Sequence, residues 1–297
     1  MFSRRISFPF GKDFFYRSPI TAFVTILIVL SFLFAAFPSI DRYVSHIFYY
    51  PGAGFPASRI ERLQSFRDYG SNLAITLPIL LLLAVGLKLI FPLKRSLMPP
   101  RVSFFFIALF LSGPGLLVHG LLKPVWARPR PVNVVDFGGA SPFLPAWMIG
   151  PHGLANYSFT SGEAATVACL LPLILFFPHE WRRPVGALLA VFVAAVSLNR
   201  IAFGAHFLSD VTISISLMLV LAAILHYLFF VRYRNALSDN ELERRLTALG
   251  LSMAASRTAL LRRLTGRRTK AVTPRPKATG GTARRAAAPI RLHPPDR

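Results

Sequence analysis

The sequence has little cysteine and little acidic charge. Cys169 is its single cysteine among 297 residues. One cysteine cannot form an intrachain disulfide, so a disulfide framework is excluded, and we expect Cys169 to be a small packing residue. Asp and Glu number 12 against 34 Lys and Arg, and charged residues make up only 15% of the chain. With 54% hydrophobic residues, 27 of them Phe, the composition excludes an ordinary soluble domain.

Six apolar runs divide the chain, and each is a candidate membrane-spanning helix. They cover residues 19–37, 73–91, 102–122, 160–177, 184–198 and 211–231. A spanning helix needs about 20 apolar residues, and the fourth and fifth runs are short by that measure. The first run and its charged lead resemble a signal peptide, but the run is long and the lead extended, which favours an uncleaved helix. The pattern predicts an all-α polytopic membrane protein, a six-transmembrane-helix bundle.

Basic residues outside the runs indicate the orientation. They gather in residues 1–18, 92–101, 179–183 and after 231. With six spans these segments share one side, and because cytoplasmic loops are basic, both termini are predicted to be cytoplasmic. The opposite, outer face carries residues 38–72, 123–159 and 199–210. Cations on that face run against the rule, among them Lys123, Arg128, Arg130 and Arg200. A bound anion is the simplest reason for them.

The chain therefore divides into four predicted segments. They are a cytoplasmic N-terminal segment (1–18), the transmembrane domain (19–231), an amphipathic helix (232–264) and a disordered basic tail (265–297). A capping box at residues 238–241 precedes leucines at helical spacing interleaved with arginines, which is typical of a helix lying on anionic lipid headgroups. The net charge is +22. Since the tail lacks an aromatic or folded element that would recognise bases, we expect no nucleic-acid partner.

The segment NRIAFGAHFLSD, residues 199–210, combines ionisable residues with an apolar surrounding. His206 and Asp210 are four residues apart, which on a helix places them in contact on one face. A carboxylate bonded to one imidazole nitrogen fixes the tautomer and makes the other nitrogen a directed base or nucleophile. Arg200 adds a planar fork for a phosphate or carboxylate. Taken alone, these residues fit equally well a buried polar cluster that links helix ends without any catalytic role.

Two further segments lie on the same predicted face. Lys123 and Arg130 flank prolines at positions 124 and 129, with a third at 131. These prolines should prevent a regular helix, so the chain turns there with its cations presented. Residues 159–163, FTSGE, open the fourth helix. Its free N–H groups and dipole favour an anion, and Gly162 allows close approach.

Together the three segments resemble the type 2 phosphatidic acid phosphatase superfamily. The motifs of that family read Lys-x6-Arg-Pro, Pro-Ser-Gly-His and Ser-Arg-x5-His-x3-Asp. The first is intact from Lys123 to Pro131, and the third is intact from Arg200 to Asp210, with Asn199 in place of the serine. In the second, Thr160-Ser161-Gly162-Glu163 stands where Pro-Ser-Gly-His is usual. The resemblance covers roughly residues 20–231.

The resemblance implies an integral-membrane lipid phosphatase without a cofactor. Phosphoryl oxygens would be held by Lys123, Arg130, Ser161, the Gly162 N–H and Arg200. His206 would attack phosphorus and form a phosphohistidine, oriented by Asp210, and water would then hydrolyse it. No metal is implied, because the outer segments lack the carboxylate cluster of a two-magnesium site.

Glu163 replaces the histidine to which the family assigns protonation of the leaving oxygen. Two roles stay open for it. It could be the acid if it is protonated at the right moment, or it could close the helix end in a Thr160-x-x-Glu163 capping box. His119 and His152 are substitute acids worth testing.

Within the superfamily the chain looks most like bacterial lipid A phosphatases, which act on the 1- or 4′-phosphate. This implies a lipid phosphate substrate in the inner membrane, with the active site facing the periplasm. Undecaprenyl pyrophosphate, phosphatidylglycerol phosphate and transfer to an acceptor lipid stay open. A missing acid favours a leaving group that departs easily. The alternative from another class is a membrane protein that binds anionic lipid without catalysis, against which the intact His206 and Asp210 argue.

Overall fold

The computed structural model describes residues 18–150 and 156–264. Predictions for residues 1–17, for His152 and for residues 265–297 lie outside these ranges. The described residues form helices and no sheet, so the all-α prediction is confirmed. The chain separates into a large unit, Met1–Ala254, and a small unit, Ala255–Arg297, which begins within the last helix.

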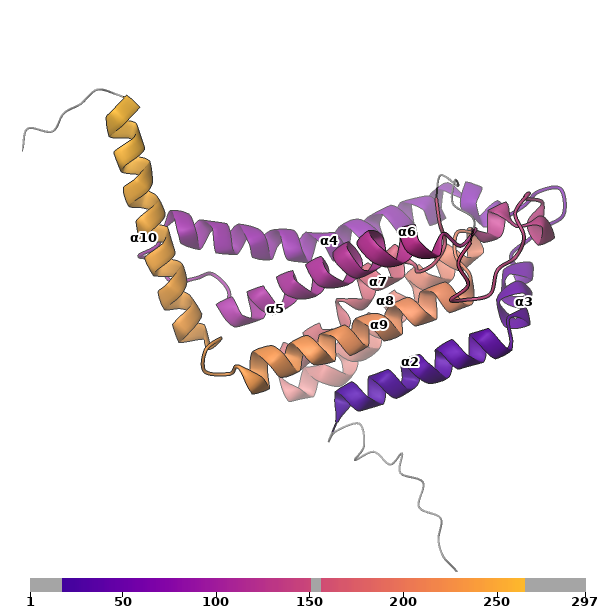
Figure 1. Cartoon of the computed structure of the whole chain (residues 1–297), viewed down its shortest axis with the longest axis horizontal. Coiled ribbons are helices and arrows are strands. Elements are labelled where there is room, and N and C mark those ends of the chain that lie inside the picture. The colour runs from indigo at the N-terminus through magenta and orange to yellow at the C-terminus, as the bar shows by residue number, and fades with distance from the viewer. Residues whose placement is uncertain (1–17, 151–155, 265–297) are drawn as a thin grey trace, which may run out of the picture. The chain divides into compact units, whose positions relative to one another are not determined.

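The long helices of the large unit run side by side (Figure 1). They are α2 (Pro19–Ala36), α4 (Glu61–Ile90), α5 (Pro100–Phe110), α8 (His179–Ala202) and α9 (Leu208–His226). The π-helical segments η2 (Leu111–Leu122) and η6 (Tyr227–Arg232) extend α5 and α9. The shorter helices are α3 (Ser39–Ile47), α6 (Lys123–Trp126) and α7 (Gly162–Ala168). The 3-10 turns are η1 (Pro56–Arg59), η3 (Pro131–Asn133), η4 (Val135–Phe137) and η5 (Leu171–Phe176), and α10 (Asp239–Leu264) ends the described chain.

Five helices of the described chain are long and apolar enough to cross a membrane, which agrees with a multi-pass protein. The fourth predicted span is the exception. Residues 160–177 do not form one helix, because α7 ends at Ala168 and η5 follows with Pro172 at its start. Proline lacks the N–H that would continue the helical hydrogen bonding. The segment Gly162–Phe176 would reach only about 20–25 Å, against a hydrocarbon core of about 30 Å. The count of six spans therefore stays a prediction.

Two segments between the predicted spans are helical in part. Residues 38–72 contain α3 and the start of α4, and the basic segment at residues 179–183 is the start of α8. The expectation that a helix could not pass Pro124 is wrong, since α6 contains it. α6 follows directly from η2, so the helical path continues through Pro124. The helix ends instead at Ala127, whose φ of 46° is left-handed.

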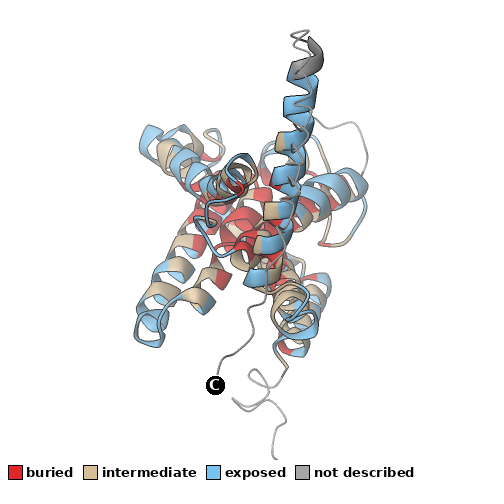
Figure 2. Ribbon diagram, turned by 90° about the vertical axis from the view of Figure 1, so that its left-hand side faces the viewer, coloured by how far each residue is buried: buried red, intermediate tan, exposed pale blue. Residues whose placement is uncertain are grey.

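The core lies along α9, which packs against α2, α5 and α7. Its main cluster includes Phe105, Leu109 and Met218, and Cys169 is buried within it. Figure 2 shows the buried residues gathered at the centre of the helical bundle and the exposed ones on its outside. Many of those outer side chains are large and apolar, such as Phe32 and Leu188. An apolar exterior suits contact with lipid.

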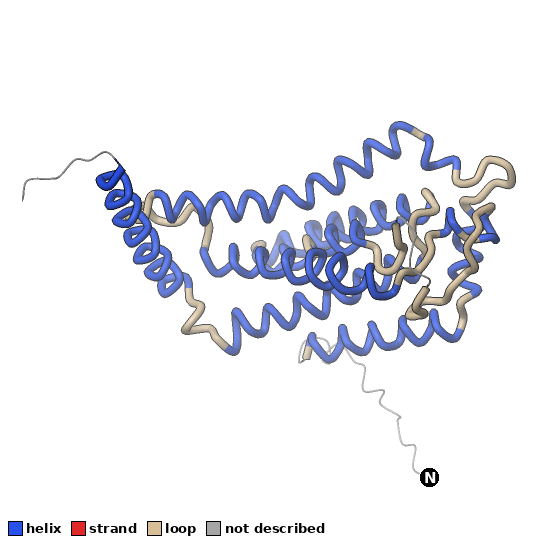
Figure 3. The backbone as a smooth tube through the Cα atoms, turned by 45° about the horizontal axis from the view of Figure 1, so that its top comes forward, coloured by secondary structure: helices blue, strands red, loops and turns tan. Residues whose placement is uncertain are grey.

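The connecting loops gather at the ends of the large unit (Figure 3). At one end, α10 contacts α4 through Glu243, whose carboxylate lies 2.7 Å from the buried Lys88 Nζ. The same carboxylate accepts from the Ser96 N–H in the loop after α4. Leu242 and Leu246 are buried as well. The first half of α10 is thus attached to protein, while the binding of anionic lipid by this helix stays a prediction. The other end carries the predicted outer segments.

Candidate active site

The predicted site residues converge on a cavity of about 250 Å³ near the end of the large unit. Its lining residues are Ser71, Ile75, His119, Lys123, Arg130, Gly162, Glu163, Thr166, Arg200 and His206. Six of the eight residues predicted for the site are among them. The other two, Ser161 and Asp210, are fully buried beside it. The three sequence segments, which are far apart along the chain, therefore meet in one place.

Three cations face this cavity from different elements. Lys123 opens α6, Arg130 follows the turn at Ala127, and Arg200 lies in the last turn of α8. Arg130 Nε and Arg200 Nη1 are buried and have no hydrogen-bond partner among the described residues. The one carboxylate in the lining, Glu163, pairs with Arg200 Nε. Buried N–H donors are rarely left unpaired, so the arrangement suits an anion that would accept from them.

His206 is buried in the turn between α8 and α9. Its Nδ1 lies 2.8 Å from the backbone carbonyl oxygen of Ser158. A carbonyl only accepts, so Nδ1 carries the proton and Nε2 keeps a free lone pair. Burial lowers the pKa of His206 well below its usual value, and the charges of Arg200, Lys123 and Arg130 lower it further. The ring is thus held neutral with one nucleophilic nitrogen.

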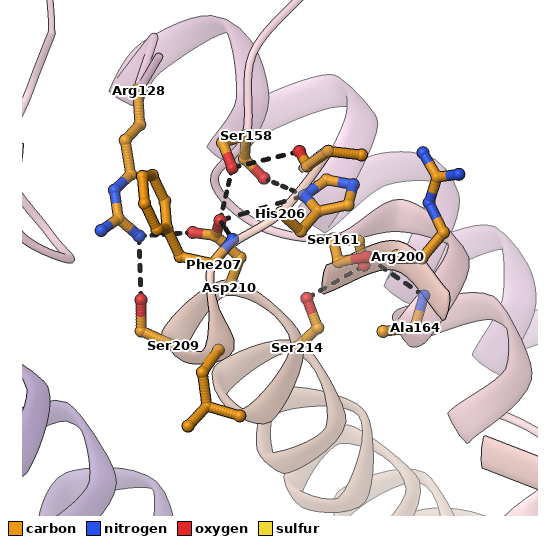
Figure 4. Close-up of polar contacts among 12 residues, drawn as sticks. Arg128, Ser158, Ser161, Ala164, Arg200, His206, Phe207, Ser209, Asp210 and Ser214 are labelled. Atoms are coloured by element: carbon orange, nitrogen blue, oxygen red, sulfur yellow. Dashed lines mark hydrogen bonds and ion pairs between the residues drawn. The ribbon is translucent and has the colours of Figure 1, made fainter. Parts of the chain in front are cut away.

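Asp210 lies within ion-pair distance of His206 but does not form the predicted hydrogen bond with it. The distance between Asp210 Oδ2 and His206 Nδ1 is 3.9 Å, too long for a hydrogen bond. The reason is that α9 begins at Leu208, so His206 precedes the helix and the four-residue spacing no longer aligns the two side chains. Oδ2 accepts instead from the Ser158 hydroxyl and, at 2.7 Å, from the Phe207 N–H (Figure 4). Asp210 is therefore linked to His206 through Ser158, which bonds to both.

Arg128 is a structural cation and lies outside the cavity lining. It is fully buried, with Nη1 2.6 Å from Asp210 Oδ1 and Nη2 2.9 Å from Asp41 Oδ2. Its Nε donates to the Leu144 carbonyl at 2.8 Å, and Nη1 also donates to Ser209 Oγ. The charge of Arg128 on the outer face is thus balanced by two protein carboxylates, those of Asp210 and Asp41. The network joins α3, the loop after α6 and the start of α9.

The start of α7 also differs from prediction. Ser161, not Thr160, is the N-cap, and its hydroxyl accepts from the Ala164 N–H at 3.3 Å. The Thr160 hydroxyl is buried without a hydrogen-bond partner among the described residues. The predicted Thr160-x-x-Glu163 capping box is therefore wrong, because Glu163 reaches Arg200 instead of the helix end.

Comparison with known proteins agrees with the motifs. A profile of the PAP2 superfamily matches residues 102–234. Two relatives named lipid A 4′-phosphatase, from Rhizobium leguminosarum and Rhizobium etli, are each 34% identical over 89% of their own length, covering 65% and 70% of this chain. The chain belongs to the PAP2 superfamily.

A third relative of this PAP2 protein, a lipid A 4′-phosphatase from Francisella tularensis subsp. novicida, is 36% identical over 37% of this chain and 51% of its own length. A solved PAP2-type phosphatidylglycerolphosphate phosphatase from Bacillus subtilis is 21% identical, with a TM-score of 0.46 over 70% of this chain and 94% of that one. Family, relatives and apolar helices together identify a multi-pass membrane protein that is a lipid phosphatase.

Several residues of this PAP2 site were missed by sequence reasoning. Ser71 and Thr166 line the cavity, and Ser71 Oγ is buried without a hydrogen-bond partner among the described residues. Ser158 contacts His206, and Asp41 contacts Arg128, which in turn contacts Asp210. None of these lies in a motif, although Ser158 is only two residues before Thr160. Among the described residues, no three His, Cys, Asp or Glu side chains gather as a metal site would require.

Proposed function

We propose that this PAP2 phosphatase removes the 4′-phosphate of lipid A through a phosphohistidine on His206. The observation that carries the proposal is the position of His206. Its ring lines the cavity together with three cations, while the hydrogen bond to the Ser158 carbonyl leaves Nε2 free to attack. A pure anion-binding protein has no use for an imidazole held in one tautomer.

The chemistry follows from these groups. The phosphoryl oxygens bind Lys123, Arg130 and Arg200. The unpaired N–H donors of the two arginines match the charge that develops in the transition state. Nε2 attacks phosphorus, the bond to the leaving oxygen breaks, and that oxygen takes a proton. Water then attacks the phosphohistidine and releases inorganic phosphate. Asp210 holds Ser158, and with it His206, in place.

Positioning and charge neutralisation are most of what phosphoryl transfer needs. Three cations already supply them here, so we propose that the reaction requires no metal ion. Lipid A is proposed as the substrate because two relatives that are matched over most of their length are named lipid A 4′-phosphatase.

The location is proposed from the charge pattern. The basic segments at residues 92–101 and after 231 are placed in the cytoplasm, so the cavity opens to the periplasm of a bacterial inner membrane. A lipid in the outer leaflet could then present its headgroup to the cavity.

Phosphate release by the detergent-purified protein tests the proposal. Lipid A, undecaprenyl pyrophosphate and phosphatidylglycerol phosphate are offered separately to the wild type, His206→Ala and His46→Ala. His46 is the control because its ring packs on Tyr49 and Phe137, outside the cavity lining. We expect release from lipid A, lost only in His206→Ala, with mass spectrometry showing that the 1-phosphate remains.

Release only from another of the three lipids would contradict the substrate. Release from none of them would contradict the enzyme itself.

A further inference from the structure

The second motif of this chain lacks the histidine that the family uses as an acid, so the source of the leaving-group proton needs an explanation. Glu163, which stands at that position, is paired with Arg200 Nε. This ion pair turns the Glu163 carboxylate toward a guanidinium. Glu163 is thus engaged in holding one of the phosphate-binding cations.

His119 lies where the missing histidine would be useful. It lines the same cavity as His206, and its imidazole rests against Gly162, the first residue of α7. A Cβ added to Gly162 would lie 2.5 Å from His119 Nε2 and 2.9 Å from Cε1. The glycine of the second motif therefore leaves the space that this ring occupies.

The position of His119 in its own helix supports the same role. It precedes Lys123 by four residues, in the segment where η2 passes into α6, and both side chains line the cavity. The side chain is exposed, and no hydrogen bond engages either ring nitrogen among the described residues. An imidazole with a free nitrogen, beside a phosphate-binding cation, is suited to move a proton.

We propose that His119 is the acid–base catalyst of this enzyme and that Glu163 is a positioning residue for Arg200. This inference rests on the proposed function. As His206 Nε2 bonds to phosphorus, the bond from phosphorus to the leaving oxygen breaks, and the His119 imidazolium gives that oxygen its proton. The neutral His119 then takes a proton from the water that attacks the phosphohistidine. The N–P bond breaks, phosphate leaves, and both histidines return to their starting states.

A pair of synthetic substrates that differ in their leaving group tests the assignment. Dodecyl phosphate releases an alkoxide that needs a proton, whereas dodecylnitrophenyl phosphate releases a stable phenolate that does not. The measured quantity is kcat/KM, which reports the steps up to departure of the leaving group. The enzymes compared are the wild type, His119→Ala, His119→Gln, Glu163→Gln and, as a control outside the cavity, His226→Ala.

We expect both His119 variants to lose about 100-fold or more in kcat/KM on dodecyl phosphate and less than about three-fold on the nitrophenyl ester. Glu163→Gln should lower kcat/KM by the same factor on both substrates, because it disturbs binding of the phosphoryl group that they share. The activity on the nitrophenyl ester also shows that the variants are folded.

An equal loss on both substrates in the His119 variants would overturn the proposal, and so would no loss. A leaving-group-selective loss in Glu163→Gln alone would identify Glu163 as the acid instead. If the wild type hydrolyses neither the two esters nor lipid A, the proposed function itself is wrong, and the role of His119 falls with that function.

Discussion

The substitution Asp210→Asn tests how the nucleophile is held in place. The Asp210 carboxylate bonds to Arg128, the Ser158 hydroxyl and the Phe207 N–H, but it lies 3.9 Å from His206 Nδ1. The tautomer of His206 is set by the Ser158 backbone carbonyl, which the substitution leaves present. Stability and catalysis should therefore respond very differently to this change.

The size of each effect follows from these contacts. Where a carboxylate bonds the catalytic imidazole directly, the change from Asp to Asn costs roughly 10⁴ in kcat, chiefly through the wrong tautomer. Here the remaining effect is the charge, at most about 4 kcal/mol at 4 Å with an effective dielectric constant of about 20. The Arg128 guanidinium, 2.6 Å from the same carboxylate, offsets much of it. We expect kcat to fall by about 10- to 100-fold.

The cost in folding should be large. Arg128 is fully buried and would keep only Asp41 as a charged partner. Breaking one side of a buried ion pair destabilises by about 3–5 kcal/mol. The assay combines kcat on the lipid substrate with thermal unfolding in the same detergent.

Asp136→Asn is the matched control, because it breaks an exposed pair with Arg42 and should change stability by no more than about 1 kcal/mol. A fall of about 10⁴ in kcat with unchanged thermal stability would refute the reasoning.

Three further predictions concern the cavity. Gly162→Ala should displace the His119 ring and lower kcat/KM on lipid A by on the order of 100-fold. Gly86→Ala is the control, because nothing lies within 4 Å of its added Cβ, and it should leave kcat/KM unchanged. Equal activities of the two variants would contradict the close packing of His119 on Gly162. Because the pKa of His206 is lowered, its ring should stay neutral as the pH falls through about 6.5; ring NMR that shows a titration centred there would contradict this. Phosphate release should survive EDTA and be blocked by vanadate, and loss on chelation that magnesium restores would rule out a metal-free reaction.

The long apolar runs and the convergence of the motifs could be predicted from the sequence. Both depend on local pattern, since hydropathy marks a helix of membrane length and motif residues keep their roles across a family. The predictions based on Pro124 and on the cap at Thr160 are wrong. Pro124 lies within α6, and Ser161 rather than Thr160 caps α7.

The polar network behind His206 could not be predicted. Arg128 and Asp41 are 87 residues apart in the sequence and meet only because α3 packs against the start of α9. The contact between Ser158 and His206 is likewise long-range and uses a backbone carbonyl, which no residue type reveals. The helical spacing of His206 and Asp210 misled because only Asp210 lies in α9.

Trapping the phosphorylated enzyme tests the central claim most directly. Lipid A carrying a radiolabelled 4′-phosphate is mixed with the wild type and with His206→Ala, and the reaction is quenched in alkali, in which phosphohistidine survives. The account predicts an acid-labile label on the wild type, mapped by mass spectrometry to His206 and absent from the variant. A label on another residue, or release of phosphate with an undiminished rate in His206→Ala, would contradict it.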